Sequence, residues 1–259
     1  MCSDRLETSV NTILPAAVAL AAVGLLADGP FRIAPTRSID QIRAESLKAT
    51  PPREEGDFLK PDLVDLATLD PRVKFDIRYA SDANFLGVPV YKTARAFLQR
   101  PAAEALKRAQ DKLADKGFGL LIHDGYRPWR VTWIFWEATP PRYREFVADP
   151  ARGSRHNRGC AVDLSLYDLK TGRPLEMPSG YDEFSPRAYS DFPGATPAQA
   201  ARRAALRDAM EAEGFLRLPE EWWHFDYKDW RKYPIQNAAF EDLPAPDENT
   251  DRPRPANEH

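Results

Sequence analysis

Residues 159–169 read GCAVDLSLYDL, a run in which strongly apolar side chains alternate with others. Successive side chains of a β-strand point to opposite faces of its sheet. Cys160, Val162 and Leu164 therefore share one face, and Asp163 lies on the other, more polar face. The stretch predicts a strand that presents a carboxylate.

Periodic patterns on either side predict the other elements. Apolar residues at helical spacing follow Pro101, and proline is favoured in the first turn of a helix. Short apolar or aromatic runs bounded by turn residues are typical of strands. The expected elements are a helix from Pro101 that ends before Gly117, a strand over 120–122, a helix opening at Pro128, a helix over 197–213 and a strand over 222–227. They do not alternate as βαβ units, which favours an α+β fold with a mainly antiparallel sheet flanked by helices.

The chain divides by composition into four parts. Its 259 residues allow one full-sized catalytic core with appendages. We expect an apolar N-terminal segment or signal peptide over 1–27, a linker over 28–58, a single functional domain over 59–241 and a disordered tail, rich in proline and charge, over 242–259.

The N-terminal segment decides the expected location. The uncharged run from Ile13 to Ala27 is shorter than the roughly 20 residues of a transmembrane helix, so we expect no stable membrane span. The run fits the apolar part of a signal peptide, although Asp4 and Glu7 precede it where positive charge is usual. We expect a periplasmic or exported protein if the segment is cleaved, and a cytoplasmic one if it is a docked helix.

Charge and cysteine content exclude several classes of protein. The 36 basic and 39 acidic side chains give a net charge of -3, which provides no positive field for nucleic acid or an anionic membrane. Only Cys2 and Cys160 are present, so a disulfide framework is not expected. The sequence leaves the oligomeric state open.

Two of the four histidines lie in distinctive settings. His156 lies in a polar turn seven residues before Asp163, so an imidazole on the loop and a carboxylate on the strand can approach one ion. His224 supplies a third ligand, and two nitrogens with one oxygen are typical of catalytic zinc. Glu221, three residues before His224, is placed to activate a metal-bound water.

Other interpretations of these residues remain open at this point. His156 and Asp163 also fit an ordinary hydrogen-bonded pair, and Glu221 fits a surface carboxylate. The H-E-x-x-H helix motif of many zinc peptidases is absent.

Three motifs in order resemble those of the D-alanyl-D-alanine dipeptidases, the family associated with vancomycin resistance. SRHNRGCAVD at 154–163 is similar to the family's S-x-H-x-x-G-x-A-x-D, and DGYRP at 124–128 and EWWH at 221–224 resemble its other two motifs. The resemblance extends from DIRYA at 76–80 to about Phe240.

The resemblance implies roles for individual residues. It makes His156, Asp163 and His224 the ligands of one Zn²⁺ and Glu221 the catalytic base. Arg127 is implied to stabilise the transition state, which is reasonable because a guanidinium offers two parallel hydrogen bonds to a developing oxyanion. For substrate binding, Asp182 is the candidate for the substrate amine, and Tyr79 and Ser154 are further contacts.

The expected function is zinc-dependent hydrolysis of D-alanyl-D-alanine, or a similar small D,D-dipeptide, in peptidoglycan metabolism. The alternatives are a D,D-carboxypeptidase that trims peptidoglycan stem peptides and a non-catalytic zinc-binding module that recognises the cell wall. Antibiotic resistance and ordinary peptidoglycan turnover are both compatible with the motifs.

Overall fold

The computed structural model describes residues 29–243. The expected signal peptide, Cys2 and all but the first two residues of the expected tail lie outside this range. Within it, no helix combines the length and the apolar character needed to span a bilayer.

A five-stranded sheet organises the molecule. Its strand order is β2-β4-β5-β7-β6, with a parallel pairing between β2 and β4 and antiparallel pairings elsewhere. These strands are β2 (Lys74–Phe75), β4 (Phe118–Asp124), β5 (Ala161–Asp168), β6 (Phe215–Leu218) and β7 (Glu221–Tyr227). A separate two-stranded sheet pairs β1 (Leu63–Asp65) with β3 (Phe97–Gln99). The predicted α+β fold with a mainly antiparallel sheet is confirmed.

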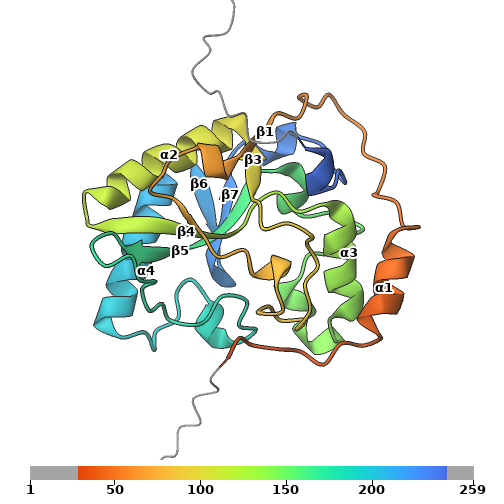
Figure 1. Ribbon diagram of the computed structural model, residues 1–259, viewed down its shortest axis with the longest axis horizontal. Coiled ribbons are helices and arrows are strands. Elements are labelled where there is room, and N and C mark those ends of the chain that lie inside the picture. Colours follow the sequence, from red (N-terminus) through yellow and green to blue (C-terminus); the bar gives the residue numbers. More distant parts are fainter. Residues whose placement is uncertain (1–28, 244–259) are drawn as a thin grey trace, which may run out of the picture.

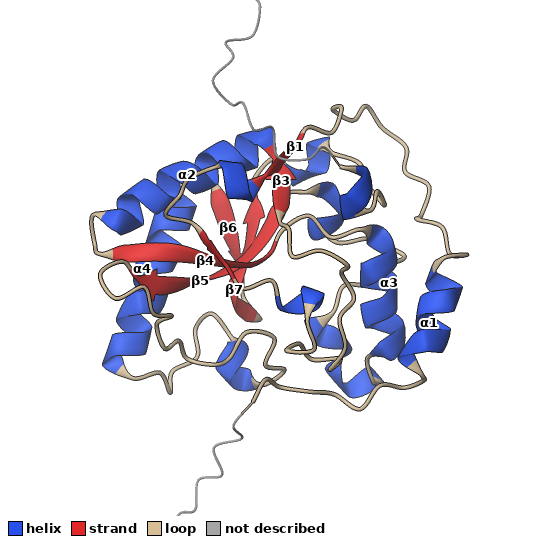
Figure 2. Ribbon diagram, viewed as in Figure 1, coloured by secondary structure: helices blue, strands red, loops and turns tan. Residues whose placement is uncertain are grey.

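In the part of the chain that the structure describes, four α-helices flank the sheet (Figure 1, Figure 2). In these views α2 (Arg100–Ala114) and α4 (Pro197–Ala212) lie on the left and α1 (Ile39–Ser46) and α3 (Trp129–Ala138) on the right, with the sheet between the pairs. Helix α2 has proline in its first turn, as predicted, and α4 begins with a capping box formed by Thr196 and Gln199.

Helix α1 lies inside the segment expected to be a linker. Its Ile42 is fully buried, and the helix contacts α3. The bond from the Thr36 amide to the Ala138 carbonyl, at 2.9 Å, ties the segment before α1 to the C-terminal end of α3. Part of residues 28–58 therefore packs on the domain.

Strand β5 is central, and both of its faces are buried. Val162, Leu164 and Leu166 are fully buried in the apolar core, while Asp163 and Ser165 are covered on the other face. Gly159 turns the chain into this strand with φ 68°, and a Cβ there would lie 2.5 Å from Leu63 Cδ2. The left-handed backbone favours glycine at this turn, and a larger residue would also have to displace the Leu63 side chain.

Candidate metal and substrate site

Three ligand atoms from separate elements converge on one point. His156 lies in a 3₁₀ turn, Asp163 on β5 and His224 on β7. His224 Nδ1 lies 3.0 Å from Asp163 Oδ1 and 3.1 Å from His156 Nε2, and the His156 and Asp163 atoms are 3.3 Å apart. Two ligands about 2.1 Å from a tetrahedral ion lie roughly 3.4 Å apart, so the spacing suits one small cation.

The second nitrogen of each imidazole has its own partner. His156 Nδ1 lies 2.7 Å from the carbonyl oxygen of Gly125, and His224 Nε2 lies 2.9 Å from Asp226 Oδ1. Both partners accept a hydrogen bond, so each of these nitrogens carries the proton of the neutral ring. The other nitrogen then presents its lone pair to the common point, which is the arrangement that metal-ligating histidines adopt.

The charges of the ligand set favour a cation. Burial opposes ionisation of Asp163, but His156 and His224 outweigh it and hold the pKa of Asp163 well below its usual range. Burial likewise disfavours the imidazolium of His224, yet Asp226 and Asp163 raise the pKa of His224 well above its usual value. The pocket thus stabilises positive charge at the centre of the three ligands, where a metal ion would supply it.

Two irregularities in the sheet bring further side chains to the same place. The pairing of β6 with β7 shifts between Arg217 and Leu218, so that Leu218 pairs with Glu221 and the next three residues of β7 have no partner on β6. The pairing of β4 with β5 shifts before Asp124, which then lies opposite Asp163. Bulges of this kind re-aim side chains next to functional sites.

Glu221 lies beside the three ligand residues but is not one of them. Its Oε2 is 3.8 Å from His224 Nδ1, and 14% of its side chain is exposed, toward the cavity that it lines. Burial, followed by the charge of Asp163, raises the pKa of Glu221 to about 7 against the opposing effect of His224. A carboxyl with such a pKa can both accept and return a proton near neutral pH.

Arg127 lines the cavity from the turn after β4. Its Nε and Nη2 both lie 2.8 Å from Asp124 Oδ2, and Nη2 is 3.5 Å from Asp163 Oδ2. The guanidinium also lies over the ring of Phe135, 4.9 Å from its centroid. The guanidinium lines the cavity, so it is available to a ligand there.

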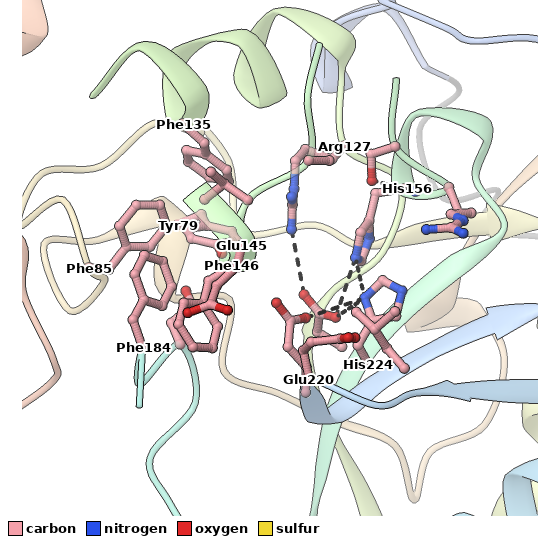
Figure 3. Close-up of a pocket in the computed structure, with 18 residues that line it drawn as sticks. Tyr79, Phe85, Arg127, Phe135, Glu145, Phe146, His156, Phe184, Glu220 and His224 are labelled. Carbon is pink, nitrogen blue, oxygen red and sulfur yellow. Dashed lines mark hydrogen bonds and ion pairs between the residues drawn. The ribbon is translucent and has the colours of Figure 1, made fainter. Parts of the chain in front are cut away.

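The cavity has a volume of about 190 Å³ and two different sides. Figure 3 shows His156 and His224 on one side and a group of aromatic rings on the other, with Arg127 reaching in between. The aromatic group consists of Tyr79, Phe85, Phe135, Phe146 and Phe184. Such a volume is below the roughly 300–1,000 Å³ of drug-sized ligand pockets, so the site suits a very small ligand.

The three expected substrate contacts, Asp182, Tyr79 and Ser154, all line this cavity. Asp182 is buried at φ 59°, and its Oδ2 has no hydrogen-bond partner within the described part of the chain. Burial, then the charge of Asp163, raises the pKa of Asp182 well above its usual range, while Tyr79 favours the charged form. Ser154 Oγ also accepts the amide hydrogen of His156 at 3.2 Å, so it shapes the ligand turn.

Three side chains around the ligands did not emerge from the sequence. Asp226 could have been found, because it lies two residues after His224 and alternation puts both on one face of the strand. The Tyr181 hydroxyl donates to Asp163 Oδ2 at 3.1 Å, a contact between distant segments. His123 stacks on Tyr181 with centroids 4.5 Å apart, and both its ring nitrogens are hydrogen-bonded, to Ser165 Oγ and to the Asp76 carbonyl.

The sequence matches one family of known proteins. The family model described as D-ala-D-ala dipeptidase matches residues 60–242. The D-alanyl-D-alanine dipeptidase of Escherichia coli (strain K12) is 36% identical over 180 residues, which cover 69% of this chain and 91% of the relative. The relative of the same name from Streptomyces coelicolor is 37% identical over 61% of this chain and 87% of its own length.

A further relative and one solved structure are similar to the chain. The D-alanyl-D-alanine dipeptidase of Enterococcus faecium is 35% identical over 65% of this chain and 91% of its own length. The structure of the LdcB LD-carboxypeptidase aligns with a TM-score of 0.36 and 22% identity over 68% of this chain and 69% of its own. By the family match and the relatives, the chain belongs to the D-alanyl-D-alanine dipeptidase family of peptidases.

Proposed function

We propose that this protein hydrolyses D-alanyl-D-alanine, or a closely similar D,D-dipeptide, with one zinc ion. The observation that carries the proposal is the convergence of His156, Asp163 and His224 on one point, with Glu221 and Arg127 in the same small cavity. The names of the relatives supply the substrate. They also favour a role in peptidoglycan metabolism.

Zinc suits this donor set better than calcium or magnesium. Two imidazole nitrogens and one carboxylate oxygen with an open fourth position are typical of catalytic zinc, whereas calcium and magnesium prefer oxygen ligands. When bound, the ion supplies a Lewis acid that polarises the scissile carbonyl and lowers the pKa of a water molecule.

Glu221 and Arg127 divide the remaining chemistry. The Glu221 carboxylate accepts a proton from the attacking water and returns it to the amine of the departing residue. The guanidinium of Arg127 donates a hydrogen bond to the oxygen of the scissile peptide as negative charge develops there. Two nitrogens of Arg127 donate to Asp124, which holds the guanidinium in place. Arg127 therefore needs to move little to form this hydrogen bond.

The cavity favours a dipeptide over a longer peptide. Asp182 provides a buried carboxylate whose Oδ2 has no partner in the described part of the chain and can accept from the substrate ammonium, and Tyr79 and Ser154 also line the cavity. A carboxypeptidase must instead leave an open path for the rest of the stem peptide at this end. A buried acid in the wall of a cavity of about 190 Å³ therefore supports the dipeptidase over the carboxypeptidase.

The test is release of D-alanine by purified protein loaded with one zinc per chain. We expect release from D-alanyl-D-alanine, loss of release with a chelator, recovery on adding zinc, and little release from a stem pentapeptide. Preferential cleavage of the pentapeptide would favour the carboxypeptidase. Zinc and dipeptide binding without any release would favour the recognition module.

A further inference from the structure

The charged side chains around the cavity do not all have a role in the chemistry above. Two cationic side chains, Arg127 and Arg155, line it. Arg127 is held by Asp124 beside the ligands. Arg155 follows Ser154 and precedes the ligand His156 in the same turn, and 43% of its side chain is exposed.

The guanidinium of Arg155 is held at one edge only. Its Nε lies 3.4 Å from Asp226 Oδ2, and its plane lies over Trp230, with Cζ 5.1 Å from the ring centroid. Within residues 29–243, neither Nη atom has a hydrogen-bond or ion-pair partner. Two donors of a pre-positioned cation therefore remain for an acceptor at the cavity.

Arg155 and Asp182 are tied to different groups of cavity residues. Asp182 is close enough to Tyr79, in the aromatic group, for that hydroxyl to favour its charged form. Arg155 is tied to Asp226, which in turn holds the ligand His224 from the side away from the common point. Asp182 is thus linked to the aromatic side of the cavity and Arg155 to the histidine side, and Figure 3 shows these two sides separated.

A zwitterionic dipeptide has the matching arrangement. Its ammonium and carboxylate lie on either side of a single peptide bond and are at most about 7 Å apart. With the ammonium at Asp182 and the peptide bond at the ligands, the free carboxylate points toward the turn that carries Arg155. Arginine can bind a carboxylate with two parallel hydrogen bonds.

We propose that Arg155 binds the free C-terminal carboxylate of the substrate through its Nη donors and so restricts the enzyme to peptides that end one residue after the cleaved bond. The inference rests on the proposed function, because it assumes that a D,D-dipeptide occupies the cavity. A C-terminal amide lacks the negative charge and offers a single acceptor, so it gains far less from this arginine.

The experiment compares D-alanyl-D-alanine with D-alanyl-D-alaninamide as substrates of the zinc-loaded wild type and of Arg155→Gln. We expect the wild type to prefer the acid. In Arg155→Gln the KM for the acid should rise roughly 10-fold, while turnover of the amide changes little, so the preference collapses. Arg155→Lys should restore part of it, since lysine keeps the charge but not the fork.

Arg231→Gln is the matched control. Arg231 also lies over Trp230, with Cζ 4.2 Å from the centroid, but it does not line the cavity. This variant should keep the preference for the acid. Calorimetry can measure dipeptide binding to zinc-loaded Glu221→Gln, with and without Arg155→Gln, so that turnover does not enter the comparison. Adding Arg155→Gln should weaken the affinity for the dipeptide by a factor similar to the rise in KM.

The outcomes separate this inference from the function on which it rests. If the wild type releases no D-alanine, both fail. Suppose that the wild type is active and that Arg155→Gln lowers kcat/KM equally for the acid and the amide, or lowers only the zinc content. Arg155 then acts through Asp226 on the metal site, and the inference alone is overturned.

Discussion

The hydroxyl of Tyr181 donates a hydrogen bond to Oδ2 of Asp163 at 3.1 Å, while Oδ1 of the same carboxylate faces the two histidines. The phenol thereby fixes which oxygen is available to a cation. Since Tyr181 immediately precedes Asp182, the loop that carries the expected amine contact also orients a metal ligand.

We therefore expect Tyr181→Phe to lower zinc affinity about 10-fold, because outer partners of metal ligands typically contribute 10- to 100-fold. Competition with a chromogenic chelator measures this directly. Tyr126→Phe is the control, since its hydroxyl bonds the Ala238 carbonyl at 2.9 Å, away from the ligands. Equal zinc affinity in the wild type and Tyr181→Phe would show that the hydroxyl does not position the ligand.

Replacing Glu221 by Gln should separate metal binding from turnover. Glutamine keeps the shape but cannot accept the proton, while His156, Asp163 and His224 are unchanged. We expect zinc content to stay at one per chain and kcat to fall by roughly 10²- to 10⁴-fold. Glu220→Gln, the neighbouring carboxylate at the cavity, is the control. A Glu221→Gln enzyme with wild-type kcat would exclude the base role.

The same carboxylate predicts how activity depends on pH. Burial raises the pKa of Glu221 to about 7, and a base works only when it is deprotonated, so kcat/KM should fall as pH decreases through this pKa. A bound cation favours the carboxylate, which moves this acid limb below pH 7 rather than above it. The profile is measured with zinc content checked at each pH. Activity that increases on acidification from neutral pH contradicts the assignment.

Asp124 is predicted to act through Arg127. Asparagine in its place would leave the Arg127 guanidinium without the negative charge that now balances it. Removing one partner of a buried ion pair is costly. We expect Asp124→Asn to lower kcat/KM by roughly 10²-fold with zinc retained. Tyr91→Phe removes the 2.8 Å bond from Tyr91 to the other Asp124 oxygen but keeps the charge of Asp124 beside Arg127, so it should cost far less. Equal losses in the two variants would argue against a role specific to Arg127.

The elements in which apolar residues recur at a regular spacing were predicted from the local sequence. The alternation at 159–169 and the helical spacing after Pro101 depend on neighbours in the sequence, and both appear in the structure as β5 and α2. Helix α1 was missed because it has eight residues in a charged segment, too few to display a period. The bulge that follows Glu221 in β7 was also out of reach, because a shift in register depends on the partner strand.

For the cavity too, only the residues in short sequence motifs could be predicted. Its ligand residues came from short motifs, whereas its aromatic side combines Tyr79, Phe135 and Phe184 from segments far apart in the chain. Asp226 was within reach of strand alternation, but the bridge from Tyr181 to Asp163 requires knowing how a loop folds back over β5.

Asp182→Asn tests how the substrate amine is recognised. Asparagine tolerates the left-handed backbone conformation at φ 59°, so the loop should keep its shape while the carboxylate is lost. We expect KM for D-alanyl-D-alanine to rise roughly 10- to 100-fold, the value of a charge-assisted hydrogen bond, with a smaller change in kcat and no loss of zinc.

Glu183→Gln is the matched control for this variant, because Glu183 bonds Ser185 and the Gly180 amide rather than lining the cavity. Burial raises the pKa of Asp182 well above its usual range, and a bound substrate ammonium opposes this by favouring the carboxylate. The wild-type KM should therefore increase as pH falls, and Asp182→Asn should lose this part of the dependence. An unchanged KM in Asp182→Asn would move the amine site elsewhere in the cavity.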